Sequence, residues 1–137
     1  MAESARRVQY FYVMAPDKPG EGARALQMLK DAGINLLAFS GFPAGKRAQL
    51  DFVPEDPAAF RAVARKAKWK VTGPKVGFLI EGDDRTGVMA ELYGKLAAAR
   101  INVTASDAVV AGAGRFGAIL WVKARVVSRT ARILGAS

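Results

Sequence analysis

Two short patterns that could bind a charged small molecule each occur twice in the chain, and the copies are 67 residues apart. The patterns are Asp-x-x-Gly and, further along, Ile-Asn. The candidate binding residues are Asp17, Gly20, Asn35, Asp84, Gly87 and Asn102. A glycine at the start of a helix lets a ligand approach the backbone, where free N–H groups and the positive end of the helix dipole favour a carboxylate. The aspartate can accept a hydrogen bond from an ammonium group, and the asparagine carries both a donor and an acceptor.

A purely structural interpretation of the same residues stays open at this point. The two aspartates could cap the helices that follow them, and the two glycines could only permit the turn. The two asparagines could simply end the loops between helix and strand.

The composition restricts what chemistry the chain can perform. It contains no Cys and no His, which excludes disulfides, zinc fingers, iron–sulfur ligation and a Ser-His-Asp triad. No pair of nucleophile and base is evident, so we expect neither an enzyme nor a cofactor. Glu81, Asp83 and Asp84 form an acidic cluster, but their spacing matches no cation-binding loop and predicts a solvated turn rather than a metal site.

The chain is strongly basic, with 21 Lys and Arg against 12 Asp and Glu and a net charge of +9. Arg61, Arg65 and Lys68 share one face of an expected helix, and a second basic helix lies near the C-terminus. A solvated basic surface explains these charges, although the same layout could contact phosphates.

Both halves of the chain predict the same order of elements. In the first half we expect strands at 8–14, 34–42, 47–53 and 69–72 and helices at 21–32 and 56–67. In the second half we expect strands at 76–81, 101–110 and 116–123 and helices at 88–99 and 126–134, with no fourth strand. Gly73-Pro74 marks the boundary, which gives two domains, 1–73 and 74–137.

The order β-α-β-β-α-β predicts an α+β protein made of two tandem ferredoxin-like units, each an antiparallel sheet with its helices on one face. The missing last strand leaves an open edge in the second unit. The sheet of the first unit or a second chain could cover that edge, and we expect a homodimer.

These motifs resemble the ACT domain, a small regulatory module that binds amino acids. The resemblance covers residues 8–72 and 75–134. Asp17-Lys18-Pro19-Gly20 and Gly33-Ile34-Asn35-Leu36 match well, whereas Thr86 and Arg100 replace the usual Pro and Gly of the second copy. The resemblance implies a non-catalytic tandem ACT protein. Its ligand would lie between the Asp-x-x-Gly loop of one unit and the second strand of the neighbouring unit. The six candidate residues would hold that ligand, and an α-amino acid, with one carboxylate and one ammonium, suits them.

The resemblance also implies regulation through the oligomer or through a partner enzyme. The mechanism would be a population shift, in which the ligand favours one packing of the two halves. A pure assembly module is an alternative, since some tandem ACT-like units bind nothing.

RNA binding is the other alternative, because RNA-recognition motifs share this order of elements. The aromatic residues on strands one and three would then be Tyr10, Tyr12, Phe52, Phe116 and Trp121. Arg115-Phe116-Gly117-Ala118-Ile119 lacks the first glycine and the second aromatic residue of that signature, so we do not expect nucleic acid as a partner. Residues 112–117 also spell G-x-G-x-x-G, but a strand follows and no acidic residue lies downstream, which predicts a hairpin turn rather than a dinucleotide site.

No apolar run approaches the ~20 residues of a membrane helix, and the first seven residues have no signal-peptide core. We therefore expect a cytoplasmic protein without a membrane partner.

Overall fold

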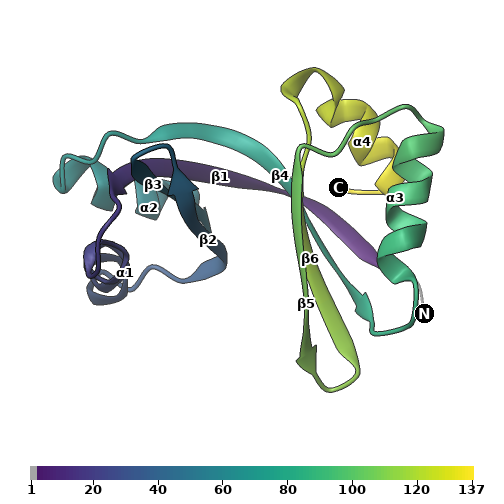
Figure 1. Cartoon of the computed structure of the whole chain (residues 1–137), viewed down its shortest axis with the longest axis horizontal. Coiled ribbons are helices and arrows are strands. Elements are labelled where there is room, and N and C mark those ends of the chain that lie inside the picture. Colours follow the sequence, from purple (N-terminus) through teal and green to yellow (C-terminus); the bar gives the residue numbers. More distant parts are fainter. Residues whose placement is uncertain (1–2) are drawn as a thin grey trace. The chain divides into compact units, whose positions relative to one another are not determined.

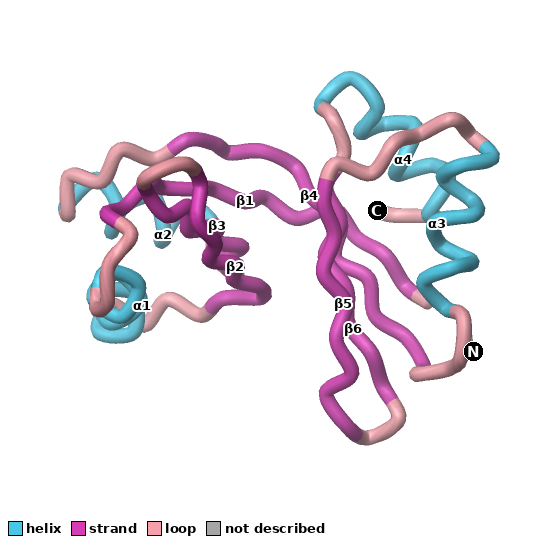
Figure 2. The backbone as a smooth tube through the Cα atoms, viewed as in Figure 1, coloured by secondary structure: helices cyan, strands magenta, loops and turns pink. Residues whose placement is uncertain are grey.

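The structure is a computed structural model that describes residues 3–137. Figure 1 labels its elements, and Figure 2 distinguishes helices, strands and loops. The strands are β1 (Ser4–Pro16), β2 (Leu36–Ala44), β3 (Arg47–Pro54), β4 (Thr72–Asp83), β5 (Ala105–Gly112) and β6 (Arg115–Trp121). The helices are α1 (Glu21–Asp31), α2 (Pro57–Lys66), α3 (Val88–Ala98) and α4 (Val127–Leu134), and a 3-10 turn, η1 (Ala124–Val126), precedes α4.

The strands are hydrogen-bonded in the order β2-β3-β1-β4-β6-β5. The chain forms two compact units. The N-terminal unit is Gln9–Lys75, and the C-terminal unit is Val76–Ser137 together with the described residues up to Val8. The long strands β1 and β4 each contribute one part to each unit. Both units therefore have four strands and two helices, and the predicted α+β fold of two βαββαβ units is confirmed.

In the N-terminal unit, an aromatic core lies between the sheet and the two helices. Phe11 on β1 is in register with Phe52 on β3, and the ring of Phe60 on α2 lies 4.9 Å from Phe11 and 5.4 Å from Phe52. All three side chains are buried. As the sequence predicted, Asp56 caps α2, because its carboxylate accepts a hydrogen bond from the Ala59 N–H at 3.1 Å.

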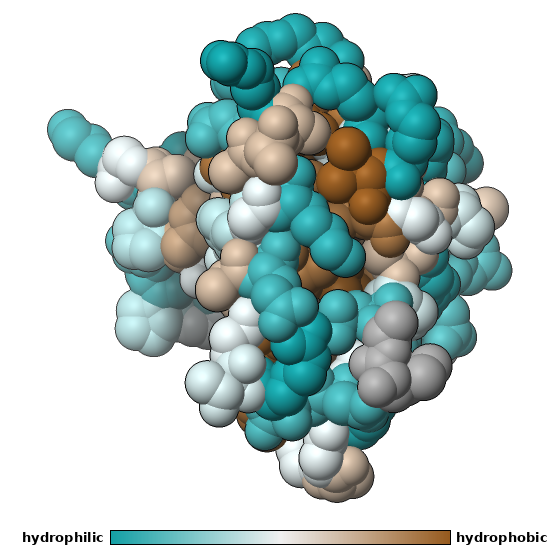
Figure 3. Space-filling view, turned by 90° about the vertical axis from the view of Figure 1, so that its right-hand side faces the viewer, coloured by the Kyte–Doolittle hydropathy of each residue, from teal (hydrophilic) through white to brown (hydrophobic). Residues whose placement is uncertain are grey.

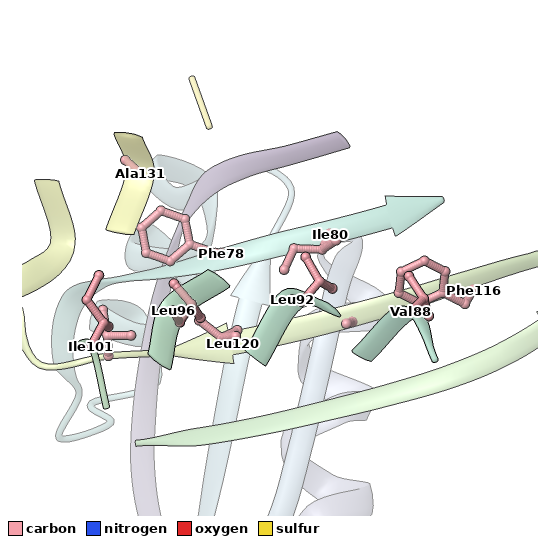
Figure 4. Close-up of a cluster of buried hydrophobic side chains, with 11 residues drawn as sticks. Phe78, Ile80, Val88, Leu92, Leu96, Ile101, Phe116, Leu120 and Ala131 are labelled. Atoms are coloured by element: carbon pink, nitrogen blue, oxygen red, sulfur yellow. The ribbon is translucent and has the colours of Figure 1, made fainter. Parts of the chain in front are cut away.

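In the C-terminal unit, α3 presents one apolar face to the sheet (Figure 4). Val88, Leu92 and Leu96 recur every four residues, so they project from the same side of the helix. Figure 4 shows them against Ile80 on β4 and Leu120 on β6. Since each fully buried leucine contributes about 2 kcal/mol, this row is a principal source of the unit's stability.

The open edge predicted for the C-terminal unit is covered by the N-terminal part of β1. No strand follows α4, as the sequence predicted, and β1 lies beside β4 in the sheet. Ala5 packs against the core of this unit, the Arg7 N–H donates to the Ser137 carbonyl at 3.2 Å, and Glu3 pairs with Arg85 at 3.0 Å. The fourth strand therefore precedes the unit in the chain instead of following it.

The expected short strand at 69–72 is wrong, because β4 begins only at Thr72 and runs without interruption to Asp83. Trp69 belongs to the core instead, since its ring stacks on Phe52 with a centroid distance of 6.0 Å. The expected boundary at Gly73-Pro74 consequently lies inside β4, whereas the division between the compact units falls after Lys75.

On the side of the molecule seen in Figure 3, hydrophilic side chains cover most of the surface and leave only a limited hydrophobic area between them. Within the described residues, none of the helices combines the length and apolar character that crossing a membrane requires.

Candidate functional site

Both Asp-x-x-Gly loops bring a glycine to the N-terminus of a helix. Gly20 precedes α1 with a φ of 93°, and Gly87 precedes α3 with a φ of 83°. Such left-handed backbone favours glycine. A Cβ at either position would meet no atom within 4 Å. The space in front of both glycines is therefore open, and it is the backbone conformation that requires them.

No side chain caps α1 or α3. The interpretation of Asp17 and Asp84 as helix caps is therefore wrong, although the same type of cap exists at Asp56 on α2. Both aspartates are exposed at the surface. An uncapped first turn leaves backbone N–H groups available to an anion, which is the property that the sequence motif predicted.

The loop at Asp84 is tied to its surroundings by polar contacts. The Asp84 N–H donates to the Gly114 carbonyl in the β5–β6 turn at 2.8 Å. Arg115, from the same hairpin, pairs with Asp83 at 3.0 Å and with Glu81 at 3.6 Å. Two of the three carboxylates in the acidic cluster are thus engaged by an arginine. Among residues 3–137, no group of three side chains has the arrangement of a metal site.

Arg85 holds the same loop from its other side. Its guanidinium hydrogen-bonds both Glu91 in the first turn of α3 and Glu3, which directly precedes β1. The hydrogen bond from Arg85 lowers the pKa of Glu91. The carboxylate of Glu91 therefore stays charged near the helix N-terminus, where it competes with any incoming anion.

The loop at Asp17 has fewer contacts. Arg24 pairs with Glu21 at 3.2 Å, and the Arg47 guanidinium donates to the Met14 carbonyl at 3.1 Å. The Asp17 carboxylate accepts no hydrogen bond from any residue that the structure describes. Of the two loops, this one is the more open to a ligand.

The two asparagines lie at the opposite ends of their helices from the glycines. The Asn35 Nδ2 donates to the Glu55 carboxylate at 3.4 Å, and the Asn35 carbonyl accepts from the Glu55 N–H at 2.9 Å. Asn102 is exposed and has no hydrogen-bond partner within the described part of the chain. Since each helix has 11 residues, a rise of about 1.5 Å per residue puts ~16 Å between loop and asparagine.

The six predicted residues therefore do not converge within either unit. In the N-terminal unit, a separate hollow lies at each end of α1. The hollow beside Asn35 has a volume of about 430 Å³ and is lined by Lys30 and by apolar residues such as Leu26 and Ile34. The hollow near the first turn, of about 200 Å³, is lined by Glu21 and Arg24 together with Met14 and Leu50.

The structure does not provide the aromatic surface that RNA binding would need on the third strand of each unit. Phe52 and Phe116 belong to the hydrophobic cores, and Trp121 is also buried. Within residues 112–117, Ala113 and Gly114 form the predicted hairpin turn between β5 and β6, and φ is positive at Gly112 and Gly114.

Several residues around the site could not be identified from the sequence. Glu55 binds Asn35, Lys30 lines the hollow beside it, and Arg115 fixes the Asp84 loop. Of these three residues, only Arg115 had a feature in the sequence that pointed to the site, because it follows the glycine-rich turn that was expected beside the second strand.

Neither a protein-family model nor a curated protein sequence matches the chain significantly. Solved structures do match it. Protein BT0572 from Bacteroides thetaiotaomicron is 14% identical, with a TM-score of 0.83 over 96% of this chain and 88% of that one. The ligand-free regulatory subunit of aspartate kinase from Thermus thermophilus is 18% identical, with a TM-score of 0.65 over 98% and 96%. The alpha and beta subunits of an aspartokinase are 16% identical, with a TM-score of 0.67 over 98% and 95%. At these identities the likeness concerns the fold alone, which is the arrangement of two βαββαβ units that the sequence predicted.

Proposed function

We propose that the chain is a regulatory protein that binds an α-amino acid and catalyses no reaction. The observation that carries this proposal is the repeated helix N-terminus without a side-chain cap, preceded by a glycine of positive φ, at Gly20 and at Gly87. The fold is also similar to that of regulatory subunits of aspartate kinase. We place the protein in the cytoplasm, with a regulated enzyme as its partner.

The carboxylate of the ligand would accept hydrogen bonds from the first turn of α1, and its ammonium group would face Asp17. Because Asn35 lies ~16 Å away at the other end of α1, a ligand that meets both kinds of residue needs the loop of one unit and the asparagine of another. A homodimer would provide this arrangement. Regulation would work by a population shift, since the ligand stabilises the assembly in which the two halves of the binding site meet.

The edge strand β5 supports the dimer. Its side chains are almost all exposed, and Val109 and Val110 keep 66% and 55% of their surface accessible. An exposed apolar edge with unpaired backbone groups is a template for pairing with another chain. Val110→Lys should therefore shift the protein from dimer to monomer in sedimentation velocity, whereas Ala98→Lys, which adds the same charge on α3, should not.

The experiment that tests the proposal is a thermal-melt screen of the full chain against the twenty amino acids. A ligand at 100 times its Kd adds about 2.7 kcal/mol of stability, which raises the Tm by roughly 5–15 °C. Asp17→Asn and Asn35→Ala should abolish the shift. Asp31→Asn, a matched loss of an exposed charge at the far end of α1, should preserve it.

If none of the twenty amino acids raised the Tm, the result would contradict the proposal that the ligand is an amino acid. A protein that also stays monomeric would contradict the half-site arrangement. A shift that survives Asp17→Asn and Asn35→Ala would place the ligand elsewhere.

A further inference from the structure

The N-terminal unit contains a cleft that the proposed function does not use. It has a volume of about 250 Å³ and lies where α2 meets the start of β4. Arg61 and Arg65 line it together with Phe11, Trp69 and Gly73. None of the six candidate residues lines this cleft.

The two arginines reach the cleft from one face of α2, because they are four residues apart. Both are exposed, and neither has a hydrogen bond or an ion pair with any residue between 3 and 137. No acidic residue lines the cleft. Two guanidinium groups without a counter-charge thus face the same small space, and a guanidinium binds carboxylate or phosphate through its fork of N–H donors.

The remaining lining of the cleft is apolar, and its aromatic rings pack in the core of the unit. Trp69 lies with its ring stacked at 18° on Phe52 and 6.3 Å from Phe60. Lys68, with a φ of 60°, reverses the backbone at the end of α2, so that the Trp69 N–H donates to the Ala64 carbonyl at 3.0 Å. The indole is thereby fixed beside the turn that carries Arg65. A rigid aromatic wall does not have to be ordered when a ligand binds, which favours binding.

Gly73 allows β4 to approach β1 closely beside the cleft. A Cβ at this residue would lie 2.8 Å from the Tyr10 carbonyl oxygen and 3.0 Å from the Phe11 ring. The 2.8 Å distance leaves no room for a side chain, so Gly73 contributes only its main chain to the cleft that it lines.

We propose that this cleft binds a small aromatic carboxylate that has no ammonium group. The carboxylate would pair with Arg61 and Arg65, and the ring would pack on Trp69. A zwitterion would be disfavoured, because its ammonium group would meet two guanidinium groups and no carboxylate. This preference distinguishes the cleft from the proposed amino-acid site.

The test uses the full-length Trp121→Phe protein, in which Trp69 is the only remaining tryptophan. Hydrocinnamate, phenylalanine and hydrocinnamamide share an aromatic ring but are an anion, a zwitterion and a neutral amide. Hydrocinnamate should change the Trp69 fluorescence with saturation near a Kd of about 1 mM. Phenylalanine and the amide should bind at least about tenfold more weakly, since they lack the unopposed negative charge.

In the same background, Arg61→Gln with Arg65→Gln should weaken hydrocinnamate binding by about tenfold or more, because both guanidinium groups are lost. Lys66→Gln is the matched control, since it removes a charge from the same helix at a residue that does not line this cleft. Far-ultraviolet circular dichroism checks that each variant is folded.

Three results would overturn the proposal: no saturable response to hydrocinnamate up to about 10 mM, equal binding by the double variant, or equal binding of phenylalanine that the double variant also weakens. Inorganic phosphate that competes as well as hydrocinnamate would also contradict it, because the apolar wall would then contribute nothing. Trp69 also lines the hollow near the first turn of α1, so only a response that the double arginine variant weakens is assigned to the cleft. Failure of this experiment leaves the amino-acid screen unaffected, since Asp17 and Asn35 do not line the cleft.

Discussion

Arg100 occupies a backbone position that the first half of the chain gives to a glycine. After α3, Arg100 has a φ of 58°, and its equivalent after α1, Gly33, has a φ of 74°. The hydrogen bonds are the same, since Ile101 donates to Leu96 at 2.9 Å as Ile34 donates to Leu29 at 2.9 Å. We predict that Arg100→Gly stabilises the protein.

The size of the effect follows from two opposing terms. A left-handed conformation costs an L-residue about 1–2 kcal/mol, which Arg100→Gly recovers. The more flexible unfolded chain of the glycine variant costs ~0.4–1 kcal/mol. The Arg100 side chain is exposed and has no polar partner within the described residues, so its loss adds little. The net gain is about 0.5–1 kcal/mol, or a rise in Tm of roughly 2–5 °C.

The assay is urea unfolding followed by circular dichroism, with two companion variants. Arg100→Ala removes the side chain but keeps the strained φ, so its free energy of unfolding should match that of the wild type. Gly33→Ala introduces the strain where a Cβ has free space, and should cost about 1 kcal/mol. If Arg100→Ala stabilised the protein as much as Arg100→Gly does, the side chain rather than the backbone would be the cause, and the reasoning would be refuted.

Three further predictions concern buried positions. Burial raises the pKa of Asp51, against the opposing effect of its hydrogen bond from Gln49. Because a raised pKa favours the protonated carboxyl in the folded state, Asp51→Asn should be more stable than the wild type at pH 7, and this advantage should shrink as the pH falls through the folded pKa; urea unfolding over a pH series checks it. Leu96→Ala should lower the free energy of unfolding by about 2–5 kcal/mol, since Leu96 is fully buried. Thr130→Val should cost about 1 kcal/mol in the same assay, because the buried Thr130 hydroxyl donates to the Val126 carbonyl at 2.7 Å.

The elements that local signals define were predictable from the sequence. The glycines at 20 and 87 marked the starts of α1 and α3, and Asp56-Pro57 marked the start of α2. The N-terminal extension of β1 was not predictable, because residues 4–7 contain a single apolar residue, Ala5. That extension is a strand because it pairs with β4, about 70 residues later in the chain.

The candidate site was predictable only in part. Glycine at positions 20 and 87 permits the positive φ observed there, and the asparagines follow the predicted helices in the sequence. The contact between Asn35 and Glu55 was not predictable, since it depends on how the loop before α2 lies against the start of β2. The strand predicted at residues 69–72 was wrong because aromatic residues such as Trp69 are common in strands and also in hydrophobic cores.

The first strand gives the C-terminal unit a discontinuous path through the sequence. Its edge comes from residues before Gln9 and the remainder from residues after Lys75, so the N-terminal unit is an insertion within it. During synthesis the inserted unit can complete its contacts first, while the surrounding unit must wait for a late segment to meet an early one. Pairings so distant in sequence close large loops and slow folding. We therefore expect the inserted unit to acquire protection from hydrogen exchange before the unit that encloses it.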